Sequence, residues 1–368
     1  MEPHKRDIRR QPKTSQCRKT AHGKDPFLPT IAKNIQQESG DKTAIYVTVR
    51  CRGRNEQETV ENRAVILRTD GIKGKTVEVS TGSLSNKSYN FNRVFSSAAD
   101  QRTIYEDTVL PMVDEMLLGY NCSAFAYGQT GTGKNYTMSG DMEAEFGLLS
   151  DNAGIIPRTL YTVFDKLKGT DSTVKCSFIE LYNEDLRDLL SDDEETKLQL
   201  FESERNSATG SLLVKGMQES YIGSPLAGIQ LLKLGSRKRQ VAATKCNDLS
   251  SRSHTIFTIN VVTKTTEECV TSGKLNLIDL AGSENIQRSG AEHKRAAEAG
   301  QINKSLLTLG RVINALVDKS SHRLGPSVKS RIMRILPRIG IVRAAEELKR
   351  RMPWIPTLGY PFSLTGAS

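Results

Sequence analysis

The stretch AFAYGQTGTGKNYTM, Ala124–Met138, joins an apolar run to a glycine-rich loop. From Gly128 to Lys134 it follows the pattern Gly-x-x-x-x-Gly-Lys-[Ser/Thr], but Asn135 stands where Ser or Thr is expected. Glycines let backbone N–H groups turn inward around phosphate oxygens, and a following helix N-terminus attracts the same anion. The stretch therefore predicts a buried strand, a phosphate-binding loop and a helix. The alternative is a glycine-rich turn with an exposed Lys134.

Hydrophobic patterning on both sides predicts strands that alternate with helices, which favours an α/β fold of three layers with a mixed central sheet. Helical spacing of apolar residues predicts one helix over 103–120, ending near Gly119, and another over 302–318. β-Branched, alternating or apolar runs predict strands at Ala44–Arg52, Lys75–Ser80, Tyr89–Phe95, Cys122–Gly128, Val174–Asn183 and Gly273–Gly282.

Composition limits the function classes. The 368 residues suffice for a sizeable core, and no run of 18 apolar residues predicts a membrane helix. The N-terminus lacks the apolar segment of a secretory signal. Six cysteines form no Cys-x-x-Cys pair, so we expect a reduced, intracellular protein without structural zinc.

Positive charge is concentrated at the two ends of the chain. Residues 1–24 carry a net +6 and residues 319–351 a net +8. The whole chain carries +10 and residues 352–368 carry no charge, so the segment 25–318 carries −4. A basic arm suits a nucleic acid or an acidic protein surface, whereas a solvated, disordered tail is the plainer interpretation of residues 1–24.

Two further segments contain residue types that phosphate chemistry uses. In LNLIDLAGSE, Asp279 ends an apolar strand, where a carboxylate can hold Mg²⁺ through water, and the Gly282 N–H can approach a terminal phosphate. NDLSSRSH, Asn247–His254, is a dense run of hydroxyl and amide side chains with one Arg. Taken singly, a strand ending in a turn and a serine-rich surface loop explain these segments equally well.

Taken together and in this order, GQTGTGK, NDLSSRSH and LIDLAGSE resemble the kinesin motor domain. SFIELYNEDLRDLL (Ser177–Leu190), GIIPR (Gly154–Arg158) and INKSLLTLGRVINAL (Ile302–Leu316) support the resemblance, which covers about residues 44–320. The long insert Ser139–Ala153 and the segment VRCRGRN look most like the mitotic BimC class of fungal kinesins.

The resemblance implies that the chain binds ATP or ADP with Mg²⁺ and hydrolyses ATP on microtubules. In the family, adenine lies against the segment matching Arg50–Gly53 and the residue matching Tyr136; Gly53 replaces a common Pro. The implied nucleotide-binding residues are Arg50, Arg52, Gln129, Thr130, Gly131, Thr132, Gly133, Lys134, Asn135, Tyr136 and Asn247. The implied catalytic residues are Ser250, Ser251, Arg252, Asp279, Gly282 and Glu284, and the metal-site positions are Asn135, Ser251 and Asp279.

Within these sets, Asn247–His254 corresponds to switch I and Asp279–Glu284 to switch II. Arg252 and Glu284 match a pair that closes over the γ-phosphate, which is a sensible charge-assisted latch. We expect His254 to form hydrogen bonds rather than act as a general base. Clustered basic residues would hold the acidic tubulin surface: Arg237, Lys238, Arg239, Lys294, Arg295, Lys304, Arg311, Lys319 and Arg323.

Asn135 is the first departure from the family pattern. The missing hydroxyl is normally a direct Mg²⁺ ligand, and Mg²⁺ requires near-octahedral oxygen geometry. The amide is longer, and its NH₂ group cannot bind a cation. We therefore expect severely impaired hydrolysis in a chain that still folds. Deliberate substitution and natural decay both account for Asn135.

The C-terminus is the second departure. Ser330–Leu336 aligns modestly with the family, and nothing matches beyond Pro337. A frameshifted, mis-spliced or truncated product would explain this tail, and loss of the last strand would leave a gap in the sheet. The expected division is a disordered basic extension over 1–43, a kinesin motor domain over 44–336 and a divergent tail over 337–368.

Three functions are compatible with parts of this pattern. The first is an ATP-dependent, spindle-type microtubule motor domain with impaired hydrolysis, cytoplasmic and cytoskeletal, forming a homo-oligomer through a stalk absent from this chain. The second is a non-hydrolysing, nucleotide-bound microtubule-binding module. The third, a nucleic-acid-dependent ATPase, explains neither the Asn247–His254 run nor the acidic central segment. No membrane partner is expected.

Overall fold

The computed structural model describes residues 46–80, 86–145, 147–193, 198–202, 212–245, 251–264, 270–283, 306–307 and 309–310. All of them belong to one compact unit, Thr43–Ser368. The predicted extension over 1–43, the tail over 337–368 and most of the helix expected over 302–318 lie outside the described residues.

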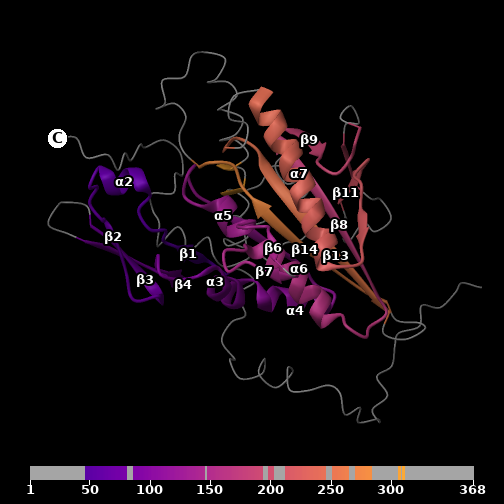
Figure 1. Ribbon diagram of the computed structural model, residues 1–368, viewed down its shortest axis with the longest axis horizontal. Helices are drawn as coiled ribbons and strands as arrows, with labels where there is room; N and C mark the ends of the chain where they lie inside the picture. Colours follow the sequence, from indigo (N-terminus) through magenta and orange to yellow (C-terminus); the bar gives the residue numbers. More distant parts are fainter. Residues whose placement is uncertain are drawn as a thin grey trace, which may run out of the picture. The chain divides into compact units, whose positions relative to one another are not determined.

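A mixed sheet forms the centre of the described structure (Figure 1). Its strands lie in the order β12-β8-β13-β14-β5, and β9 pairs with β8. Their bounds are β5 Asn121–Ala126, β8 Ser172–Tyr182, β9 Asp185–Asp188, β12 Ser220–Ile222, β13 His254–Lys264 and β14 Val270–Asp279. All pairs are antiparallel except β14 with β5. The mixed sheet expected from the sequence is therefore confirmed.

The parallel pair β14 and β5 positions the two chemistry-bearing segments. Its register sets Asp279 opposite Ala126, so both strands end at the same edge of the sheet. From Leu275 to Asp279 every side chain of β14 is buried, on both faces of the strand. Continuous burial of this kind is typical of a central strand covered on both sides.

A second, four-stranded sheet has the order β1-β4-β3-β2. Its strands are β1 Thr48–Arg50, β2 Leu67–Thr69, β3 Lys73–Val79 and β4 Lys87–Phe95. The strands predicted near 75–80 and 89–95 are present, and β1 is shorter than predicted. Two short hairpins complete the strand content of the described ranges: β6 Ala144–Glu145 with β7 Leu148–Leu149, and β10 Gln199–Glu202 with β11 Leu212–Lys215.

Five of the six helices in the described ranges pack on the central sheet or on one another. They are α2 Glu56–Val60, α3 Gln101–Thr108, α4 Leu110–Leu117, α5 Lys134–Met138, α6 Ile155–Lys166 and α7 Pro225–Lys245. Helix α4 contacts β14 and β5, α7 contacts β8, and α6 contacts both α4 and α7 (Figure 1). Fully buried side chains such as Leu160, Leu232 and Phe257 join these layers in one apolar core.

The single helix predicted over 103–120 is divided into α3 and α4 at Val109. Pro111 lies in the first turn of α4, and proline has no N–H to donate to the preceding turn. The predicted end near Gly119 is correct, because Gly119 has φ +95° and its N–H donates to the Met116 carbonyl. In the part of the chain that is described, no helix is both long enough and apolar enough to cross a membrane.

Candidate functional site

The glycine-rich loop connects β5 to α5, which is the strand–loop–helix arrangement predicted from the sequence. Gly131 and Gly133 have φ of +78° and +92°, and Gly133 directly precedes α5. No atom lies within 4 Å of a Cβ added at either position. Backbone conformation, and not crowding, therefore requires glycine here. The Lys134 ammonium donates hydrogen bonds to the carbonyls of Gly128 and Gln129, at 2.9 and 3.0 Å, so it lies against the loop.

Backbone hydrogen bonds tie the segment after β14 to this loop. The N–H of Leu280 donates to the Ala126 carbonyl (3.2 Å), and the N–H of Ser283 donates to the Gly128 carbonyl (3.1 Å). The N–H of Gly282 donates to the Ser251 carbonyl at 2.8 Å. The described parts of the three segments that the sequence singled out therefore meet at one edge of the sheet.

Asp279 is a buried carboxylate at this edge. Its Oδ1 has no hydrogen-bond partner among the described residues, and the residue is 8% exposed. Burial raises the pKa of Asp279, while the positive charges of Arg239 and Lys134 oppose that rise. A buried carboxylate oxygen without a partner is costly unless a cation compensates it. Asp279 is thus suited to a divalent cation held directly or through water, as Mg²⁺ is held by carboxylates in nucleotide sites.

His254 begins β13 and is 6% exposed. Its Nδ1 accepts a hydrogen bond from the Ala281 N–H at 3.1 Å, which assigns the proton of the neutral ring to Nε2. Burial, together with the positive charges of Arg239 and Lys134, lowers the pKa of His254 to about 4. The ring is therefore neutral at physiological pH and joins β13 to the segment after β14, in agreement with the hydrogen-bonding role expected of it.

Arg239 lies inside the structure, although the sequence grouped it with surface residues. Its Nε lies 3.5 Å from Glu180 Oε1 and donates to Ser253 Oγ at 3.2 Å. Its Nη2 donates to the Ser253 carbonyl at 3.1 Å. The Arg239 side chain is 14% exposed and that of Glu180 is 1% exposed. The Arg239 side chain therefore points inward, which disfavours the expected microtubule contact, and that contact stays a prediction.

Arg237 and Lys238 differ from Arg239 in their surroundings. Arg237 is exposed on α7. The Lys238 ammonium donates to the Ser191 carbonyl (2.7 Å) and to Asp192 Oδ1 (3.1 Å). Arg237 alone of the three presents a well-exposed charge.

A polar network lies beside α5. The Arg50 Nη1 donates to Gln101 Oε1 and to Thr137 Oγ1, both at 2.8 Å. Its guanidinium lies over the Tyr136 ring, 5.1 Å from the ring centroid. The Tyr136 hydroxyl donates to Asn152 Oδ1 at 2.9 Å. The predicted residues Arg50 and Tyr136 are thus neighbours, whereas nothing in the sequence singled out Gln101.

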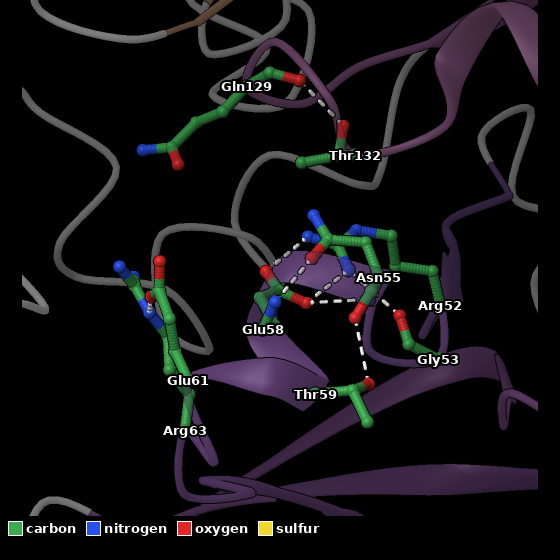
Figure 2. Close-up of polar contacts among 9 residues, drawn as sticks. All are labelled: Arg52, Gly53, Asn55, Glu58, Thr59, Glu61, Arg63, Gln129 and Thr132. Atoms are coloured by element: carbon green, nitrogen blue, oxygen red, sulfur yellow. Dashed lines mark hydrogen bonds and ion pairs between the residues drawn. The ribbon is translucent and has the colours of Figure 1, made fainter.

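Arg52, also predicted to bind nucleotide, is paired with helix α2 (Figure 2). Its guanidinium forms two 2.7 Å hydrogen bonds to the Glu58 carboxylate and one of 2.8 Å to the Gly53 carbonyl. Asn55 caps the helix and exchanges hydrogen bonds with Glu58. The Arg52 partner, helped by the Asn55 N–H, lowers the pKa of Glu58 to about 2.

The remaining loop residues are exposed. Thr132 Oγ1 donates to the Gln129 carbonyl at 2.7 Å (Figure 2). Asn135 is exposed in the first turn of α5, and its carbonyl accepts from the Ser139 N–H at 2.8 Å. No group of three or more His, Cys, Asp or Glu side chains in the described ranges is arranged to hold a metal.

Several predicted site residues lie outside the described residues. They are Asn247, Ser250, Glu284, Lys294, Arg295, Lys304, Arg311, Lys319 and Arg323. Ser251 and Arg252 are described and half-buried, and the Ser251 carbonyl accepts the hydrogen bond from the Gly282 N–H. The Arg252–Glu284 latch therefore stays a prediction.

The family model "Kinesin motor domain" matches residues 50–337. The kinesin-like protein bimC of Emericella nidulans is 66% identical over 310 residues, covering 83% of this chain and 26% of that protein. The kinesin-like protein cut7 of Schizosaccharomyces pombe is 47% identical, covering 80% of this chain and 29% of that protein. The chain thus spans less than a third of the length of these two curated relatives.

A solved structure, "Structure of a fast kinesin: Implications for ATPase mechanism and interactions with microtubules", superposes with a TM-score of 0.70. It is 37% identical and covers 79% of this chain and 80% of its own. The family model, the similar solved structure and the glycine-rich loop therefore all indicate the same family. A strand–loop–helix cradle next to a buried carboxylate, in a chain that matches this family over most of its length, means that the protein belongs to the kinesin motor domain family.

Proposed function

We propose that this chain is the ATP-dependent microtubule motor domain of a mitotic-type kinesin, with ATP hydrolysis impaired by Asn135. The observation that carries the proposal is the unpartnered Oδ1 of Asp279, buried beside the loop that holds Lys134. Lys134 and the backbone of the glycine-rich loop lie on one side, and the Asp279 carboxylate lies on the other. This arrangement suits a nucleotide bound with Mg²⁺.

Each residue has a distinct part in this proposal. Gly131 and Gly133 shape the loop so that its N–H groups face the phosphates, and Lys134 supplies positive charge there. Asp279 and Ser251 would hold Mg²⁺, which supplies neutralisation of phosphate charge when bound. The Gly282 N–H would donate to a terminal phosphate oxygen in place of the Ser251 carbonyl. Because this change breaks the hydrogen bond between the two switch segments, phosphate binding would alter the position of both.

Asn135 weakens the metal side of this arrangement and leaves the loop intact. Its exposed carboxamide takes the place of a compact hydroxyl in the first turn of α5. Phosphoryl transfer depends mostly on positioning and charge neutralisation, so a displaced metal costs transition-state stabilisation directly. A loss of about 3 kcal/mol corresponds to roughly a hundredfold lower rate.

A non-hydrolysing, nucleotide-bound microtubule-binding module is the second candidate, and the same residue, Asn135, favours it. In both cases the exposed Arg237 on α7 contributes positive charge toward acidic tubulin. We further propose a spindle-associated, cytoskeletal location and homo-oligomerisation through a stalk outside this chain. These proposals rest on the resemblance to the mitotic BimC class given above and on similarity to the kinesin-like proteins bimC and cut7.

Microtubule-stimulated phosphate release tests the proposal. We expect Asn135→Thr to release phosphate at least about a hundredfold faster than the unaltered chain. Asn135→Ala, which removes the amide without restoring a hydroxyl, is the matched control and should stay slow. Equal rates for the unaltered chain and the Asn135→Thr variant would refute the proposed effect. Microtubule co-sedimentation with ATP then separates the two candidates, because a non-hydrolysing module stays bound as ATP is added.

A further inference from the structure

We propose that Gln101 is a positioning residue for the nucleoside side of the proposed nucleotide site, acting through Arg50. The inference rests on the proposed function, because it assumes that a nucleotide binds at the loop. It adds a residue from α3, a helix that contributes nothing to the phosphate loop itself.

The first argument is the complete use of the Gln101 carboxamide. Gln101 is 4% exposed. Its Oε1 accepts from Arg50, and its Nε2 donates to the carbonyls of Tyr136 (2.7 Å) and Asn152 (3.2 Å). A buried amide that satisfies its oxygen and both of its N–H groups holds a single orientation, because any rotation leaves a buried polar group unpaired.

The second argument is what this orientation fixes. Arg50 donates two hydrogen bonds from one nitrogen, to Gln101 and Thr137, and its guanidinium carbon lies over the Tyr136 ring. Thr137 Oγ1 in turn donates to the Gly133 carbonyl at 2.9 Å. Gln101 is thus connected to Gly133, the last glycine of the loop, through the side chains of Arg50 and Thr137.

The third argument is the chemistry of the surface that results. Tyr136 is 46% exposed and lies two residues after Lys134. A half-exposed aromatic ring beside a fixed guanidinium is suited to stacking against a planar base. A nucleotide whose phosphates lie in the loop would extend its base toward this platform. Without Gln101, Arg50 would lose a charge-assisted hydrogen bond and its fixed plane, and the platform would become mobile.

The experiment compares two probes that share phosphate chemistry but differ in the base. ADP and inorganic pyrophosphate are titrated by calorimetry at fixed Mg²⁺ into the full chain and into Gln101→Leu. We expect ADP to bind about tenfold more weakly to Gln101→Leu, the scale of one charge-assisted hydrogen bond. Pyrophosphate should bind within about twofold of the unaltered chain, since it engages only the loop. Hydrolysis is not the readout, so Asn135 does not obscure the result.

Two further variants separate positioning from simple destabilisation. Tyr105 lies on α3 like Gln101, and Tyr105→Phe removes its partly buried hydrogen bond to Thr162 Oγ1 (2.7 Å). This variant should leave the ratio of ADP to pyrophosphate affinity unchanged. In an Arg50→Met background, Gln101→Leu should have little additional effect on ADP, because its action passes through Arg50.

The outcomes are distinguishable. Equal weakening of both probes by Gln101→Leu, or unchanged ADP affinity, overturns the positioning role. Additive effects of Gln101→Leu and Arg50→Met overturn the route through Arg50. If the unaltered chain binds ADP no better than pyrophosphate, the proposed nucleotide site itself fails, and this inference fails with it.

Discussion

The buried ring of His254 makes the stability of the protein depend on pH. The native pKa is about 4 and the ordinary value is 6.5. Between these values the unfolded chain binds a proton at His254 and the native chain does not, so stability falls as the pH falls. From these two values, the contribution of His254 to the free energy of unfolding should be about 2 kcal/mol lower at pH 5 than at pH 8, and roughly 3 kcal/mol lower once the pH is below 4. Protonation of Nδ1 would also place a donor against the Ala281 N–H.

Asp279 acts in the opposite direction, because its raised pKa lets the native state take up a proton before the unfolded chain does. A difference between variants removes this contribution. Urea unfolding followed by far-UV circular dichroism, at pH 5 and pH 8 without added nucleotide, should give a smaller pH effect for His254→Asn than for the unaltered chain. An identical pH dependence in the two proteins would refute the reasoning.

Three other substitutions test the packing described above, each by urea unfolding at pH 7.5. Asp100→Ala removes the carboxylate that caps α3 and should cost about 1 kcal/mol; no measurable change would show that the cap contributes nothing. Leu160→Ala leaves a cavity at a fully buried position and should cost about 2–5 kcal/mol; a cost near zero would mean that the core collapses around it. Arg239→Leu leaves Glu180 buried without its cation and should cost about 3–5 kcal/mol, whereas the control Arg237→Leu should change stability by under ~0.5 kcal/mol. Similar costs for the two arginine variants would contradict the inward placement of Arg239.

The strand–loop–helix unit could be predicted from the sequence because its signal is local. Glycine spacing, the apolar run before it and Lys134 all lie within the single stretch Ala124–Met138. The end of β14 at Asp279 was predictable for the same reason, since Asp279 ends the apolar run in LNLIDLAGSE. The order of the three motifs then indicated the kinesin family, and the match to the kinesin motor domain model confirms it.

Arg239 and Gln101 could not be predicted because their roles depend on distant partners. Consecutive residues on a helix point about 100° apart, so the run Arg237–Arg239 is a cluster in sequence but not in space. Glu180, the partner of Arg239, comes from β8. Gln101 is the first residue of helix α3, a position where a polar side chain is ordinarily exposed. Its partners come from distant parts of the chain: Arg50 at the end of β1 and the carbonyls of Tyr136 and Asn152.

The parallel ladder of β14 and β5 has a mechanical consequence. Asp279 is in register with Ala126, and the Ser283 N–H donates a hydrogen bond to the Gly128 carbonyl at the start of the loop. Any bending or twisting of the sheet carries the carboxylate and the loop together as one piece. A change in spacing around a bound phosphate must therefore originate on the other side, where the Gly282 N–H meets the Ser251 carbonyl. In the proposed motor, a movement that follows phosphate binding would be hinged at that hydrogen bond, with the sheet as the rigid part.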